Sequence, residues 1–256
     1  MNLPIIYKVR MRSLIESIFK FEKIRKIYKD NYNDPDFNIN FWAKALKILN
    51  INYEVDGKVN IPSSGPCLII CNHPFGIVDG LIISALVAEV REDYKILINE
   101  ELAEVNHIKK YLFPLSFKKT KGAKISNINS KNKAIKHLKN NGLLITFPSG
   151  EVATSKFIFD KAKEREWKPL VASIYKKSPC EITPVFFSGQ NSLFFQFVGF
   201  INNNLRRILF VQELLNKKNK TINLTIGKSF KIMEFIKDNN FYLAERMRKK
   251  VLSLIN

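Results

Sequence analysis

The sequence predicts an α/β fold with a mixed, mostly parallel central sheet flanked by helices, preceded by an N-terminal helical segment. Two observations lead to this prediction. From residue 53 onward, short apolar runs alternate with segments of helical periodicity. In addition, 46% of the 256 residues are hydrophobic and 12% are aromatic, which is enough to cover both faces of a sheet. We therefore divide the chain into an amphipathic helical segment, 1–52, and one α/β domain, 53–256.

The N-terminal segment contains two candidate amphipathic helices. In 11–28, apolar residues recur at helical spacing with Lys and Arg between them. A polar loop follows at 30–36, and Trp42 and Leu46 lie on one stripe of a second helix at 39–51. A basic amphipathic helix lies on a membrane interface or packs against the core of its own protein. We favour packing, which is the commoner role of such a stripe.

The other elements follow in chain order. Strands are expected at 58–61, 67–71, 94–98, 143–147, 182–187 and 221–226. Helices are expected at 79–91, 108–112, 130–140, 161–177, 205–216 and 240–255. The polar, basic stretch 118–133 is expected to be an exposed loop or flap. Sites in such sheets form beyond the carboxyl ends of the strands, so the loops that carry His73, 148–151 and 184–191 are expected to meet at one crevice.

Charge and cysteine content limit the function classes. The formal net charge is +19, which attracts polyanions such as nucleic acid or an anionic bilayer, unless it reflects only a Lys-rich composition on solvated surfaces. Three cysteines form no disulfide framework and fit a reducing, cytosolic compartment. No metal-ligand spacing is present, so no metal is expected. The most apolar helix candidate, 77–90, is too short to span a bilayer, and we expect a protein without a membrane span.

The strongest chemical signal is His73 with Asp79, directly after the apolar run 67–71. An imidazole takes up a proton near neutral pH, and a nearby carboxylate fixes its tautomer and stabilises its charged form. A turn built by Pro74 and Gly76 allows the two side chains to meet, with Asp79 near a helix N-terminus. The spacing alone also fits a helix-capping Asp and a hydrogen-bonded His at a strand end.

Two further motifs follow apolar runs. The first is Pro148-Ser149-Gly150-Glu151, a sharp turn at which backbone N–H groups can approach a ligand. Taken alone, this turn also fits an ordinary loop with a solvated Glu. The second is the run 182–187, in which Pro184 indicates an edge strand or a strand end.

In order and spacing, these motifs resemble those of the glycerolipid (lysophospholipid) acyltransferase family. The likeness is greatest to its bacterial branch of hemolysin-like or ornithine-lipid-type acyltransferases, and it covers about 53–230. The matching motifs are Asn72-His73-Pro74-Phe75-Gly76 with Asp79, Phe147-Pro148-Ser149-Gly150-Glu151-Val152, Trp167-Lys168-Pro169, Ile182-Thr183-Pro184-Val185 and Gly189-Gln190-Asn191-Ser192. The resemblance implies a glycerol-3-phosphate-acyltransferase-like fold and an acyltransferase domain at 53–256.

The chain departs from the family pattern in three places. Five residues separate His73 from Asp79, where most members have four. Glu151 follows Gly150 rather than preceding it, as in this branch. The middle motif of the family carries an Arg for an acceptor phosphate, whereas 113–119 contains no Arg, so Lys118 and Lys119 are the cationic candidates there. The substrate-binding residues that the resemblance implies are Asn72, Phe75, Gly76, Lys118, Lys119, Pro148, Ser149, Gly150, Glu151, Pro184 and Asn191.

The resemblance implies transfer of an acyl group from acyl-CoA or acyl-carrier protein to a lyso-lipid hydroxyl, a lysophospholipid or a lyso-ornithine lipid. His73 would be the general base, oriented by Asp79, and no bound cofactor is needed. An anionic membrane surface, at the inner face of the cell membrane, is the expected partner and location. Two alternatives remain open: a hydrolase that uses the same pair, and a basic nucleic-acid-binding protein, for which no recognition motif stands out.

Overall fold

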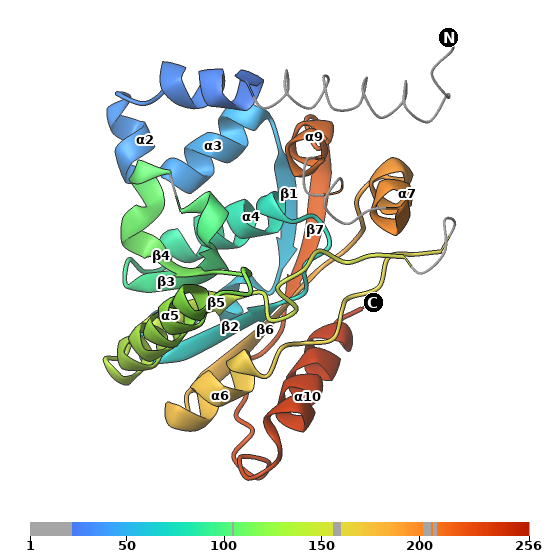
Figure 1. Ribbon diagram of the computed structural model, residues 1–256. Helices are drawn as coiled ribbons and strands as arrows, with labels where there is room; N and C mark the ends of the chain where they lie inside the picture. Colours follow the sequence, from blue (N-terminus) through green and yellow to red (C-terminus); the bar gives the residue numbers. More distant parts are fainter. Residues whose placement is uncertain (1–21, 104, 156–159, 202–205, 207–208, 256) are drawn as a thin grey trace.

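The computed structural model describes residues 22–103, 105–155, 160–201, 206 and 209–255. Its centre is a seven-stranded sheet in the order β1-β7-β6-β2-β5-β3-β4 (Figure 1). The five strands from β6 to β4 run parallel, whereas β7 is antiparallel to β6 and β1 is parallel to β7. The predicted mixed, mostly parallel sheet is confirmed. The strands are β1 Asn52–Asp56, β2 Cys67–Cys71, β3 Tyr94–Asn99, β4 Leu112–Leu115, β5 Leu143–Thr146, β6 Glu181–Phe187 and β7 Thr221–Ile226.

Helices cover both faces of the sheet. One face packs against α3, α4 and α9, and the other against α5, α6 and α10 (Figure 1). Strand β2 shows why the apolar run is continuous, since Ile69 enters one core and Leu68 the other. The helices are α2 Pro35–Ile39, α3 Phe41–Leu49, α4 Ile77–Ala88, α5 Lys121–Lys139, α6 Leu170–Lys177, α7 Leu193–Ile201, α9 Phe210–Asn216 and α10 Asn240–Leu252, with 3₁₀ turns η1 Lys58–Asn60, η2 Glu100–Leu102 and η3 Asn106–Tyr111.

The N-terminal segment packs on the core where it is described. Residues 22–30 are helical, and the earlier part of the predicted helix 11–28 lies outside the described residues. Helix α3 corresponds to the predicted helix 39–51 and packs against α4. Its Trp42 is buried and donates its ring N–H to the Tyr94 hydroxyl at 2.6 Å. The favoured packing role therefore holds for α3, and the division at residue 52 stays a prediction.

The predicted strand at 58–61 is wrong. The strand in this region is β1, at one edge of the sheet, which ends directly before Gly57, and 58–60 form the 3₁₀ turn η1. Gly57 has φ +75°, and a Cβ there would lie 2.2 Å from the carbonyl oxygen of Ile226. A backbone turn that only glycine accommodates therefore separates the strand from the apolar residues that follow it.

The predicted flap at 118–133 is also wrong, because α5 begins at Lys121. Thr120 caps this helix by accepting the backbone N–H of Ala123 at 3.1 Å. The first half of α5 exposes Ile125 and Ile128 and buries little, so its sequence lacks the apolar stripe that marks a packed helix. The helix predicted at 108–112 is replaced by η3 and strand β4.

Two other helices differ from their predicted extents. The helix predicted at 161–177 begins only at Leu170, directly after Pro169. The segment before it has no regular secondary structure, apart from an antiparallel bridge between Lys163 and Thr154. The helix predicted at 205–216 is described as α9 from Phe210, because 202–205, 207 and 208 lie outside the described residues. Helix α7 was not predicted.

Candidate active site

Three loops meet beyond the carboxyl ends of three adjacent strands. His73 follows β2, the Pro-Ser-Gly-Glu turn follows β5, and 188–191 follow β6. Strand β2 is hydrogen-bonded to β5 on one side and to β6 on the other. The sheet order therefore brings together the three loops that the sequence analysis selected.

His73 and Asp79 form a hydrogen-bonded pair. The distance from His73 Nδ1 to Asp79 Oδ2 is 3.0 Å. The turn between them passes through Gly76, which has φ +82° and ψ −115°, and Asp79 is the third residue of α4. Because a carboxylate can only accept, Nδ1 carries the proton and Nε2 of the neutral ring is left as a base.

Asp79 is fully buried and organises the turn as well as the ring. Its Oδ2 accepts the backbone N–H groups of Phe75 and Gly76, both at 2.9 Å. Its Oδ1 is buried and has no hydrogen-bond partner among the described residues. Burial raises the pKa of this carboxyl group, and the bonds from His73, Phe75 and Gly76 oppose the rise.

The rest of His73 is held from three sides. Its backbone N–H donates to Glu164 Oε2 at 2.9 Å, and its carbonyl oxygen accepts the N–H of Ala153 at 2.8 Å. The imidazole lies against the ring of Phe147, with 4.3 Å between the ring centroids. Its side chain is 19% exposed, and Nε2 has no hydrogen-bond partner in the part of the chain that the structure describes. The imidazole is therefore fixed in place, and its Nε2 is unpaired among the described residues.

Glu164 is a site residue that was not predicted. It is buried, and its Oε1 accepts the indole N–H of Trp167 at 2.9 Å while Oε2 holds His73. Burial raises the pKa of its carboxyl group, and the hydrogen bonds from His73 and Trp167 oppose this. Because 161–177 was predicted to be a helix, the contact of Glu164 with His73 was not foreseen. The one available signal was the Trp167 motif, three residues after Glu164.

Asn72 and Pro184 make their contacts within the sheet. The Asn72 side chain donates to the carbonyl oxygen of Phe187 at 2.9 Å and accepts its N–H at 2.7 Å. Pro184 lies in the central strand β6, so the expected edge or strand-end position is wrong. It is tolerated because it lies between the β7 ladder, which begins at Val185, and an isolated bridge at Ile182. The structure gives neither residue a substrate-facing polar group.

Phe75 and Asn191 stabilise the turn that follows His73. Both are buried, and Asn191 donates a long hydrogen bond of 3.5 Å to the carbonyl oxygen of Phe75. The ammonium group of Lys217 lies 4.7 Å from the centroid of the Phe75 ring and 3.5 Å from Glu213 Oε2. Burial lowers the pKa of Lys217, and Glu213 opposes this. This buried ion pair was not predicted.

The acid of the Pro148–Glu151 turn pairs with exposed cations. Ser149 is buried and donates to the Glu151 carbonyl oxygen at 2.8 Å, and Gly150 has φ +65°. Pro148 is buried, and its carbonyl oxygen accepts the N–H of Lys168 at 2.9 Å. The Glu151 carboxylate is exposed, 3.7 Å from Lys168 Nζ and 3.9 Å from Arg165 Nε. It belongs to a charged cluster at the rim of the site.

The two predicted lysines lie at the same rim. A Cβ at Gly150 would be 3.1 Å from the ring of Phe117, so the loop with Lys118 and Lys119 borders the turn after β5. Lys118 Nζ is 2.9 Å from Glu100 Oε1, and this contact raises its pKa. Lys119 is exposed. The negative charge of Glu100 thus already balances one of the two cations.

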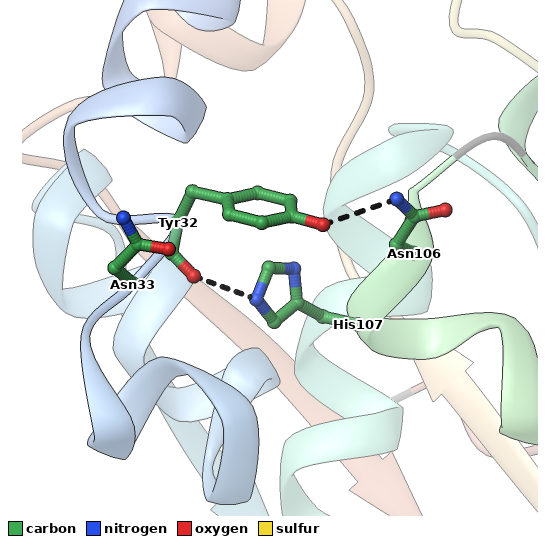
Figure 2. Close-up of a pocket in the computed structure, with 4 residues that line it drawn as sticks. All are labelled: Tyr32, Asn33, Asn106 and His107. Atoms are coloured by element: carbon green, nitrogen blue, oxygen red, sulfur yellow. Dashed lines mark hydrogen bonds between the residues drawn. The ribbon is translucent and has the colours of Figure 1, made fainter.

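A hollow of about 290 Å³ lies elsewhere, where the N-terminal segment meets η3. Figure 2 shows its lining residues, Tyr32, Asn33, Asn106 and His107. His107 donates from Nε2 to the Tyr32 carbonyl oxygen at 3.1 Å and accepts the Tyr28 hydroxyl at Nδ1, 2.8 Å away (the first contact is drawn in Figure 2). Since both ring nitrogens are occupied, this histidine is not a second candidate base.

Neither a membrane span nor a metal site is found among the described residues. No helix in this part of the chain combines the length and hydropathy of a membrane span. The same residues contain no group of three or more His, Cys, Asp or Glu side chains arranged to hold a metal ion.

The chain is similar to known acyltransferases. Residues 6–254 match the profile of the acyltransferase family. Two lyso-glycine lipid O-acyltransferases are similar in sequence. That of Phocaeicola vulgatus is 23% identical over 84% of this chain and 77% of the relative, and that of Bacteroides thetaiotaomicron is 25% identical over 77% and 73%. The crystal structure of the 1-acyl-sn-glycerophosphate (LPA) acyltransferase PlsC from Thermotoga maritima shares the fold, with a TM-score of 0.57 and 18% identity over 96% of this chain and 97% of that chain.

Proposed function

Because this chain belongs to the acyltransferase family, we propose that it moves a fatty acyl group from an acyl thioester to the hydroxyl group of a lyso-lipid, with His73 as the general base. The observation that carries the proposal is the state of the imidazole. Nδ1 is held by a fully buried carboxylate at 3.0 Å, while Nε2 has no partner among the described residues. Such a ring is prepared to accept one proton at one atom.

The proposed reaction is a direct transfer. Nε2 of His73 takes the proton of the acceptor hydroxyl as its oxygen attacks the thioester carbonyl carbon. The new C–O ester bond forms, the C–S bond breaks, and the thiolate leaving group takes the proton back from the imidazolium. Asp79 holds the ring and stabilises its transient positive charge through the Nδ1 hydrogen bond. No bound cofactor is required by these steps.

Attack on a thioester carbonyl develops an oxyanion, which backbone N–H groups at a helix start can stabilise. The structure restricts this role, because the N–H groups of Phe75 and Gly76 donate to Asp79 Oδ2. These two groups stabilise the carboxylate that orients the base, and they are not free to bind a developing oxyanion.

For the acceptor, we favour a lyso-lipid with an amino-acid head group over a glycerol phosphate. The two similar relatives are named for lyso-glycine lipid, which supports this choice. The region 113–119 lacks the Arg that phosphate recognition favours, and Lys118 is paired with Glu100. Both acyl-CoA and acyl-carrier protein present the required thioester, and we retain both as donors.

We also propose that the protein works at an anionic membrane surface at the inner face of the cell membrane. The formal net charge of +19 supports this location, since each Lys or Arg near such a surface contributes up to about 1 kcal/mol of attraction.

The test is radiolabelled acyl transfer with both donors and a panel of lyso-glycine lipid, lyso-ornithine lipid and lysophosphatidic acid. We expect acceptor-dependent product with the wild type and loss of at least a thousandfold in rate with His73→Ala, which should stay folded by circular dichroism. A folded His73→Ala protein with the wild-type rate would refute the role of His73. Release of free fatty acid at the same rate with and without acceptor would identify a hydrolase instead.

A further inference from the structure

Helix α7 exposes apolar side chains and buries a polar one, which is the reverse of an ordinary surface helix. Within 193–199, each exposed residue is large and apolar: Leu193 is 53% exposed, and Phe194 and Phe197 are each 40% exposed. The polar residue of this stretch, Gln196, is only 3% exposed and accepts the backbone N–H of Ser155 at 3.1 Å. A helix that packs on a water-soluble core shows the opposite arrangement. The exposed apolar face therefore needs a partner.

The fold places this face beside the candidate active site. Phe195, on the buried side of α7, packs with Val152. The next residue, Ala153, holds the His73 carbonyl oxygen at 2.8 Å. A single layer of side chains therefore lies between the exposed face of α7 and the segment that holds His73. Figure 1 shows α7 on the side of the molecule away from α5 and α6.

Positive charge borders the same face. Ala162 donates its N–H to Gln190 Oε1 at 2.7 Å, which ties the segment before α6 to the residues that precede α7. Lys161 and Lys163, on either side of Ala162, are both exposed. Apolar side chains bordered by exposed lysines match an anionic bilayer, where the former enter the acyl boundary and the latter face the phosphates.

We propose that α7 is a membrane-docking helix, which inserts Leu193, Phe194 and Phe197 into the interface of an anionic bilayer next to the His73 loop. The choice of a bilayer rests on the proposed function, since acyl chains of lipid substrates lie in that phase. Docking through α7 would place the His73 loop near the lipid surface, so that a lyso-lipid needs to rise only partly from the bilayer to reach His73.

The experiment measures binding of the full-length protein to sedimenting vesicles without any acyl donor, with and without anionic phosphatidylglycerol. The test variant is Phe194→Gln/Phe197→Gln. The matched control is Phe241→Gln/Tyr242→Gln in the first turn of α10, where the side chains are 65% and 71% exposed (α10, lower part of Figure 1). We expect at least a tenfold loss of vesicle affinity for the test variant and no loss for the control. Lys161→Gln should weaken binding to anionic vesicles by about fivefold at low salt.

Wild-type affinity in the α7 variant, or an equal loss in both pairs, would overturn the proposal. A second measurement separates docking from chemistry, because acyl transfer to an acceptor dispersed in detergent should be unchanged within twofold in the α7 variant. A loss there as large as on vesicles would assign α7 to the substrate path and overturn docking. If the wild type binds vesicles through α7 but acylates no lyso-lipid, the proposed function fails while the docking helix stands.

Discussion

Asp79→Asn separates the charge of the aspartate from its hydrogen bonds. All three donors that reach Asp79 converge on Oδ2, namely the ring N–H of His73 and two backbone N–H groups. An asparagine whose carbonyl oxygen occupies the Oδ2 position keeps all three bonds. Its NH₂ group then takes the place of Oδ1, which has no partner among the described residues. The tautomer of His73 is preserved, and only the negative charge is lost.

The size of the catalytic loss follows from the geometry. With 3.0 Å between Nδ1 and Oδ2, the charge centres of imidazolium and carboxylate are about 4 Å apart. At an effective dielectric constant of about 20, their attraction is about 4 kcal/mol. Removing it from the transition state, in which the ring is charged, slows turnover by about a thousandfold. The ring remains in position, so the Michaelis constants should change little.

The variants Asp79→Asn and Asp79→Ala should differ in stability. Asp79→Asn exchanges one unpaired buried group for another and removes a buried charge, so the free energy of unfolding at neutral pH should stay within about 1 kcal/mol of the wild type. Asp79→Ala leaves the N–H groups of Phe75 and Gly76 without an acceptor, which costs about 2–6 kcal/mol in total.

The contribution of Asp79 to the free energy of unfolding should change with pH in a definite direction. Burial raises the pKa of Asp79 above its ordinary value of 3.8, so the folded state binds its proton more tightly than the unfolded state. The contribution of this group to stability is present at low pH and is lost as pH rises through the raised pKa. The stability of Asp79→Asn relative to the wild type should therefore increase with pH above about 4.

The assays are urea denaturation at several pH values and acyl transfer with each variant. If Asp79→Asn keeps more than a tenth of wild-type turnover, the carboxylate charge is not part of the reaction. If Asp79→Asn unfolds at the same urea concentration as Asp79→Ala, the three donors do not all bind Oδ2 of Asp79. If the stability of Asp79→Asn relative to the wild type falls as pH rises, burial does not raise the pKa of Asp79.

Two further substitutions test the surroundings of the pair. In Glu164→Gln, a single amide oxygen must replace two carboxylate oxygens that accept N–H groups from His73 and Trp167, so one donor loses its partner. We expect about 1–3 kcal/mol less stability in urea and a turnover loss without a matching rise in Michaelis constants; a pure rise in those constants would place Glu164 in substrate binding. Glu151→Gln, at an exposed charged rim, should change the free energy of unfolding by less than about 0.5 kcal/mol. Its acceptor Michaelis constant should rise while turnover holds, and unchanged constants for both substrates would exclude Glu151 from acceptor binding.

Much of the fold follows from local pattern. The apolar runs of β2, β5, β6 and β7 are long enough and β-branched enough to identify these strands without tertiary information. Strand β4 and the first half of α5 escape prediction because their pattern is weak. Helix α5 exposes Ile125 and Ile128, and its early turns depend on a Thr120 cap rather than on a buried stripe.

The sequence by itself identified the candidate catalytic pair of this protein. It contains a histidine and an acid on either side of a glycine turn after a buried strand, because the amino acids that accept protons and those that permit a turn are specified by type and spacing. Only the tertiary structure decided which partners these residues meet. Glu164, 91 positions from His73 in the chain, reaches the backbone N–H of His73 because a bridge between Lys163 and Thr154 and a hydrogen bond from Lys168 to Pro148 hold its segment beside the turn after β5. The face that α7 leaves in solvent was likewise fixed by packing, since a short run of apolar residues does not show which of them the core will cover.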